Sequence, residues 1–194
     1  MHKFKELERF VYSYLEKHLP ENNYYHNIRH VKEVVRTAEY IGKKEGLNKE
    51  ELLLLKTAAL LHDIGHIHTR KGHEEKSVEM AEKILQEYGY ERWEIERIKE
   101  AILATRIPQE PRSRIAEILC DADVINIGTD SFFESSELIR LEEGREMNRE
   151  WLQGLLSFLE NHHFFTDTAK KEFLKKKKEN MERVLALLED MDSS

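Results

Sequence analysis

The sequence has little glycine, proline and cysteine, and each shortage excludes a class of protein. Eight glycines and three prolines among 194 residues fall far below the usual shares of roughly 7% and 5%. Sandwiches, barrels and disordered linkers need more of these turn residues, so an all-α protein is predicted. The single cysteine, Cys120, excludes an intrachain disulfide and favours a reducing compartment. We therefore expect a cytoplasmic protein.

Long apolar runs and an excess of positive charge are also missing. No run of about 18 apolar residues occurs, so neither a membrane span nor a membrane partner is expected. The first residues, MHKFKELERF, contain no apolar core of a signal peptide. The formal net charge is -7, from 31 Lys and Arg against 38 Asp and Glu. This argues against a nucleic-acid polymer as partner, which needs a concentrated basic face, and stays compatible with a small phosphorylated substrate.

Apolar residues recur at helical spacing over almost the whole chain, and no stretch alternates as a strand would. Helices are predicted over residues 28–41, from Asn48 to about Gly65, and over 73–88, 91–105, 112–127, 148–163 and 166–190, with one or two short helices in 130–145. At roughly 150 residues per domain, the length predicts one domain spanning residues 1–194.

The run LLLLKTAALLHDIGH is predicted to form the central helix of the core, because it is apolar on nearly every side. Asn48 begins this helix, and Glu51 completes a capping box with it. His62 and Asp63 lie near the end of the run. A buried carboxylate is costly unless it is paired or binds a cation. A metal ion is the simplest explanation for this pair.

Three short segments place imidazole and carboxylate groups next to predicted core positions: YYHNIRH at residues 24–30, HDIGH at 62–66 and DAD at 121–123. Nitrogen and oxygen donors without thiolate favour Mg²⁺, Mn²⁺, Fe²⁺, Ni²⁺ or Zn²⁺. Asp121 and Asp123 lie on opposite flanks of the core stripe of their helix. Helical periodicity therefore does not choose between these two carboxylates.

The order His30, His62-Asp63 and Asp123 resembles the H…HD…D pattern of the HD superfamily of metal-dependent phosphohydrolases. The contexts YHNIRHV, ALLHDIGH and ILCDADVINIG carry the resemblance. It implies an all-α bundle in which these four side chains hold one divalent ion. In the family pattern the aspartate after alanine is the ligand, which selects Asp123 over Asp121.

The resemblance covers residues from about 20 to 130, the expected HD core. The remainder, about 131–194, contains FFESSELIR and FLENHHFFT and looks like the C-terminal helical extension of prokaryotic HD hydrolases. The segment YHNIRH is also similar to the YHNxxH motif of cyclic-nucleotide phosphodiesterases. That similarity implies that His26 donates a proton to the leaving oxygen and that His30 binds the metal. In the segment after ILAT, Arg106 stands where those enzymes have aspartate.

His73 resembles the extra histidine of HD proteins that bind two metal ions. Such proteins have a further histidine near Thr105 or Arg106, and this sequence has none there. One ion per chain is therefore expected, with His73 beside the substrate. His66 and His68 are expected in a loop.

The basic residues after the HD dyad suggest phosphate contacts, because Arg binds phosphate in bidentate fashion and Lys as a point charge. The candidates for substrate binding are Arg70, Lys71, His73 and Arg106.

The resemblance implies hydrolysis of a phosphomonoester or phosphodiester, a nucleotide or related small molecule, by metal-activated water that Asp63 helps to orient. Two alternatives stay open. One is a non-catalytic metal or nucleotide sensor. The other is a di-iron oxygenase of the same fold, for which the required extra histidines are only half present.

Overall fold

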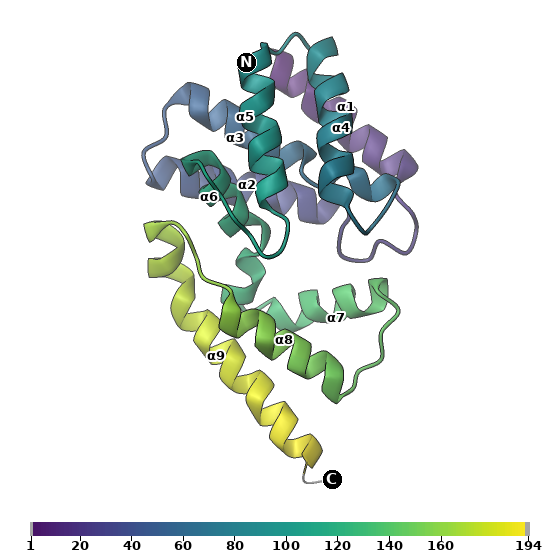
Figure 1. Ribbon diagram of the computed structural model, residues 1–194, viewed down its shortest axis with the longest axis vertical. Coiled ribbons are helices and arrows are strands. Elements are labelled where there is room, and N and C mark those ends of the chain that lie inside the picture. The colour runs from purple at the N-terminus through teal and green to yellow at the C-terminus, as the bar shows by residue number, and fades with distance from the viewer. Residues whose placement is uncertain (1, 193–194) are drawn as a thin grey trace.

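The computed structural model describes the backbone of residues 2–192 and the side chains of residues 4–191 (Figure 1). Within that range the chain forms nine α-helices, two short 3₁₀ helices and no strand, which confirms the all-α prediction. The helices are α1 (His2–His18), α2 (Ile28–Lys44), α3 (Lys49–Leu61), η1 (Ile64–Ile67), α4 (His73–Glu87), α5 (Arg92–Ala104), α6 (Arg114–Asp123), η2 (Ile125–Gly128), α7 (Phe132–Glu142), α8 (Arg149–Asn161) and α9 (Asp167–Asp192).

The helix α1 was not predicted, although its sequence carries a helical signal. Phe4, Leu7, Val11 and Leu15 recur at three- and four-residue spacing, and all four are buried against the first core. This stripe packs α1 against α3 and its neighbours. The charged residues between the four apolar positions make the segment look polar when it is read without its periodicity.

The central helix α3 ends at Leu61, four residues earlier than the predicted end at Gly65. After His62 the chain tightens into η1, where Gly65 packs directly against α4. A Cβ atom at Gly65 would lie 2.1 Å from the carbonyl oxygen of His73. Because α3 ends early, His62 and Asp63 lie directly after a buried helix.

The apolar core has two parts, seen in Figure 1 as an upper group of α1–α6 and a lower group of α7–α9. The first part surrounds α3, whose residues from Leu54 onward are all buried except Lys56. The second part is built from residues of η2, α7, α8, α9 and the segment that joins α8 to α9, with Phe132, Trp151 and Phe164 among its largest side chains.

Buried polar contacts join the two parts. The carboxylate of Asp121 accepts hydrogen bonds from the backbone N–H groups of Phe165 and Thr166, both at 2.8 Å, and from Thr166 Oγ1 at 2.7 Å. Glu45 Oε1 accepts from the backbone N–H and Oγ1 of Thr168 at 2.8 and 2.6 Å. Both carboxylates thus bind the N–H groups around the start of α9, which otherwise lack helical partners.

The buried side-chain amide of Asn180 offers a test of the contacts of α9 with the rest of the fold. Asn180 of α9 is fully buried, and its Nδ2 donates to the carbonyl oxygens of Ile127 and Thr129 at 3.0 and 2.9 Å. We expect Asn180→Leu to lower the free energy of unfolding by about 1–3 kcal/mol, because both carbonyls lose a buried donor. Urea denaturation measures this loss. The control Asn161→Leu removes an exposed amide that bonds only to Ser157, and a loss of similar size there would contradict the explanation.

Candidate metal centre

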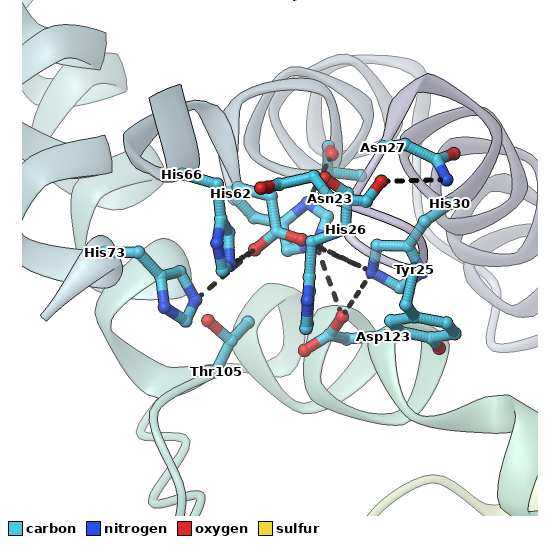
Figure 2. Close-up of polar contacts among 12 residues, drawn as sticks. Asn23, Tyr25, His26, Asn27, His30, His62, His66, His73, Thr105 and Asp123 are labelled. Atoms are coloured by element: carbon cyan, nitrogen blue, oxygen red, sulfur yellow. Dashed lines mark hydrogen bonds and ion pairs between the residues drawn. The ribbon is translucent and has the colours of Figure 1, made fainter. Parts of the chain in front are cut away.

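Four predicted donors come together from three elements (Figure 2). The side chain of Asn27 caps α2, which places His30 in the first turn of that helix. His62 and Asp63 follow α3 directly, and Asp123 is the last residue of α6. These are the segments that the sequence analysis grouped, and the fold brings them to one point.

The donor atoms lie at distances that fit around one small cation. Asp123 Oδ1 is 3.1 Å from His30 Nε2 and 3.2 Å from His62 Nε2. Asp63 Oδ2 is 3.4 Å from His30 Nε2 and 3.3 Å from His62 Nε2, and the two Nε2 atoms are 3.4 Å apart. A divalent ion bound at roughly 2.0–2.2 Å separates neighbouring donors by roughly 3.0–3.5 Å. The arrangement therefore fits a metal ion.

The protonation of these groups also favours a cation. His62 Nδ1 donates to the carbonyl oxygen of Ala59 at 2.8 Å, which leaves Nε2 free to bind a metal. Burial opposes charge on His62, but the carboxylates of Asp63 and Asp123 outweigh it and raise the pKa of His62 well above its ordinary value. Asp63 Oδ2 is buried and has no hydrogen-bond partner. The site is built for positive charge.

The other oxygen of Asp63 faces two further histidines. Asp63 Oδ1 lies 3.4 Å from His73 Nε2 and 3.8 Å from His66 Nε2, so this second group is wider and has fewer donors. His73 Nδ1 donates to the carbonyl oxygen of Arg70 at 2.9 Å. His66 is buried in η1 rather than in a loop, and both of its nitrogens lack a hydrogen-bond partner. His68, in contrast, lies in the turn after η1, outside a helix as expected, and is exposed.

His26 lies beside the four donors without joining them. Its ring stacks on His66 at a centroid distance of 4.3 Å, and its Nδ1 is 2.6 Å from Glu142 Oε1. Glu142 was missed by the sequence analysis, because it lies 116 residues away at the end of α7 and no local motif marks it.

A cavity of about 370 Å³ extends from these residues toward the C-terminal helices. His26, Asp63, His73 and Asp123 line its polar end. Most of its apolar wall comes from the extension, namely Phe132, Ile139, Trp151, Leu155 and Phe158, and the rest from Ile107, Val124 and Ile127. Arg145 also lines the cavity, and its guanidinium lies 5.3 Å above the ring of Trp151. Neither Arg145 nor the apolar wall was predicted from the sequence.

Of the four predicted substrate-binding residues, only His73 lines this cavity. Arg70, Lys71 and Arg106 do not. The guanidinium of Arg70 donates to the carbonyl oxygens of Glu142 and Asn22. Arg106 pairs with Glu75, and Lys71 is exposed. Their contacts with substrate stay predictions.

None of the helices within residues 2–192 combines the length and the apolar character needed to cross a membrane.

Comparison with known proteins places this site in a family. The HD domain model matches residues 27–128. An uncharacterized protein from Clostridium beijerinckii is 37% identical over 106 residues, which cover 52% of this chain and 64% of that protein. The present chain thus spans less than two thirds of that relative. The similarity of YHNIRH to cyclic-nucleotide phosphodiesterases stays a prediction.

Two crystal structures share the fold. One is a predicted HD superfamily hydrolase from an uncultured Thermotogales bacterium, 24% identical with a TM-score of 0.64, covering 94% of this chain and 92% of that one. The other is Bacillus subtilis YpgQ in complex with ADP, 20% identical with a TM-score of 0.71, covering 97% and 95%. Since the HD model spans more than half of the sequence and includes all four clustered donors, the chain belongs to the HD domain family.

Proposed function

We propose that this protein is a metal-dependent phosphohydrolase that acts on a small phosphomonoester or phosphodiester of the nucleotide class. The observation that carries the proposal is the cluster of two imidazoles and two carboxylates, spaced 3.1–3.4 Å apart at the polar end of a cavity. Imidazole and carboxylate are the ligands of divalent ions that catalyse hydrolysis.

His30, His62, Asp63 and Asp123 would hold one divalent cation, either Mg²⁺, Mn²⁺, Fe²⁺, Ni²⁺ or Zn²⁺. When bound, such an ion polarises a phosphoryl oxygen and makes water more acidic. We assign one ion per chain, because the group formed by Asp63, His66 and His73 is wider. Asp63 Oδ1 faces His73 and His66, away from the other three donors, and we assign to it the orientation of the attacking water.

His26 is the proposed proton donor to the leaving oxygen. It lines the cavity, and its Nδ1 is engaged by Glu142, so Nε2 is the nitrogen left for the substrate. Burial lowers the pKa of His26, but the hydrogen bond to Glu142 and the charge of Asp63 outweigh it and raise the pKa above its ordinary value. The ring therefore carries its proton more readily near neutral pH, as a general acid requires.

The cavity supports a substrate with an organic part as well as a phosphate. The apolar wall and Arg145 would contact the organic part of such a substrate, and the acidic and imidazole groups at the other end would hold its phosphate through the metal ion. The ADP complex of the similarly folded YpgQ supports a nucleotide. His73 lies at the polar end and is the predicted substrate residue that the cavity favours.

A substrate panel tests the function. The purified protein, loaded in turn with each of the five ions, is assayed for phosphate release from nucleoside phosphates and sugar phosphates, and for ring opening of cyclic nucleotides to nucleoside monophosphates. We expect turnover of at least one nucleotide, lost in Asp123→Ala. Stoichiometric binding of metal and nucleotide without turnover of any substrate would instead support a sensor. Oxygen consumption by the iron-loaded protein would support an oxygenase.

The ligand assignment predicts which variants lose metal. Single alanine substitutions of His30, His62, Asp63 or Asp123 should bring bound metal, measured by mass spectrometry of the folded protein, well below one ion per chain. Asp121→Ala is the matched control, because its carboxylate bonds to Phe165 and Thr166. It should lower the melting temperature and keep the metal. Loss of metal in Asp121→Ala with retention in Asp123→Ala would reverse the assignment, and two ions in the wild type would contradict a single site.

The role of His26 predicts a dependence on the leaving group. In His26→Asn the side-chain amide can still donate to Glu142, so the fold and the metal content should persist. We expect kcat to fall by about 10² or more for esters with poor leaving groups, because general-acid catalysis is lost. The loss should be smaller for p-nitrophenyl esters, whose leaving group departs without a proton. Equal losses for both classes, or loss of the metal, would show that His26 is not the acid.

A further inference from the structure

The carboxylate of Glu142 is completely engaged by the loop that carries His26. Its Oε1 is 2.6 Å from His26 Nδ1, and its Oε2 accepts hydrogen bonds from the backbone N–H groups of Tyr25 and His26 at 2.9 and 3.0 Å. Glu142 is only 3% exposed. Such a buried carboxylate is costly unless every lone pair that faces the protein is satisfied, and here three donors satisfy it.

These bonds fix both the tautomer and the place of the imidazole. An ionised carboxylate can only accept hydrogen bonds, so His26 Nδ1 must carry a proton and Nε2 is the nitrogen presented to the cavity. The two backbone bonds hold the loop, and the stacked ring of His66 limits rotation of the side chain. In Figure 2 the His26 ring points into the site, with His66 on one side and Asp123 on the other.

The end of α7 is itself tied to the same loop. The guanidinium of Arg70 donates to the backbone oxygen of Glu142 and to that of Asn22, which lies just before the His26 loop. One arginine therefore connects the extension, the loop and the segment after η1. Glu142 lies outside residues 27–128, the part of the chain that the HD model matches.

We propose that Glu142 is the positioning residue of His26, through which the C-terminal extension orients the proton donor of the HD core. This inference rests on the proposed function, in which His26 protonates the leaving oxygen. Glu142 does not contact the metal donors or the reacting atoms. It acts by holding His26 Nδ1 and the backbone of residues 25 and 26.

The variant Glu142→Gln tests the hydrogen bonds of Glu142 while the size of its side chain is kept. The side chain of Gln has the size of Glu but only one acceptor and one donor group. If its oxygen faces the two backbone N–H groups, its amide NH₂ faces His26 Nδ1 and drives the ring proton to Nε2. If the amide turns around, both backbone bonds are lost. Glu142→Gln therefore removes at least one function of the carboxylate in either orientation. The control Glu137→Gln changes an exposed carboxylate on the same helix, which pairs with Arg140.

The first experiment is nitrogen NMR of the Zn²⁺-loaded full-length protein with labelled histidine. We expect a protonated Nδ1 on His26 in the wild type and in Glu137→Gln. In Glu142→Gln we expect either an altered ring nitrogen pattern or a shifted backbone N–H resonance of His26, according to which way the amide turns. Both signals unchanged in Glu142→Gln would overturn the proposal, as would an unprotonated Nδ1 in the wild type. The wild-type spectrum decides the question alone if Glu142→Gln does not fold.

The second experiment is a double-mutant cycle on the active substrate. Glu142→Gln should lower kcat by about 10-fold or more with little change in KM, because an interaction that matters only in the transition state is lost. The loss should again be smaller for p-nitrophenyl esters. In the His26→Asn background, Glu142→Gln should lower kcat no further. Equal losses in both backgrounds would overturn the proposal and make Glu142 structural.

The two failures can be told apart. A wild-type rate in His26→Asn would overturn the proton-donor role in the proposed function. The NMR comparison would then still decide whether Glu142 positions the ring.

Discussion

The site depends on two carboxylates, Asp63 and Asp123, that are held against two imidazoles and have little access to water. Buried anions at such close range are stable only when positive charge and good geometry compensate for their lost hydration. A cation provides this charge, and a proton on His62 does so in its absence, as the direction of its pKa shows. The core must therefore hold α2, α3 and α6 in a fixed relation, because small shifts would leave a carboxylate unpaired.

Close packing around α3 provides this rigidity. Ala58 and Ala59 are completely buried and let the neighbouring helices approach. Gly65 does the same where η1 meets α4, since any side chain there would collide with the backbone of His73. The close approach places His73 opposite the second oxygen of Asp63. The turn at η1 thus ends the central helix and sets the place of α4. It also lets one oxygen of Asp63 face His30 and His62 while the other faces His66 and His73.

Local patterns predicted most helices and the three donor segments, because helical periodicity and neighbouring donors are written in short stretches of sequence. Periodicity did not place the end of α3, since the change to η1 depends on contact with α4. It also left Asp121 and Asp123 undecided, and only the packing of α9 shows that Asp121 faces Phe165 and Thr166. Glu142 was beyond prediction, because a single glutamate in a charged sequence carries no sign of a partner 116 residues away.

The four clustered donors and most of the apolar wall of the cavity come from different parts of the chain. All four donors lie within residues 27–128, whereas Arg145, Trp151 and the carboxylate that engages His26 come from the extension. In the proposed function, metal binding requires the packing of α2, α3 and α6, whereas substrate fit and orientation of the proton donor also require α7 and α8 to dock. Under that proposal a change in the extension would alter which phosphate ester is accepted while the metal centre is preserved, so the chemistry of the site and its selectivity would be physically separable.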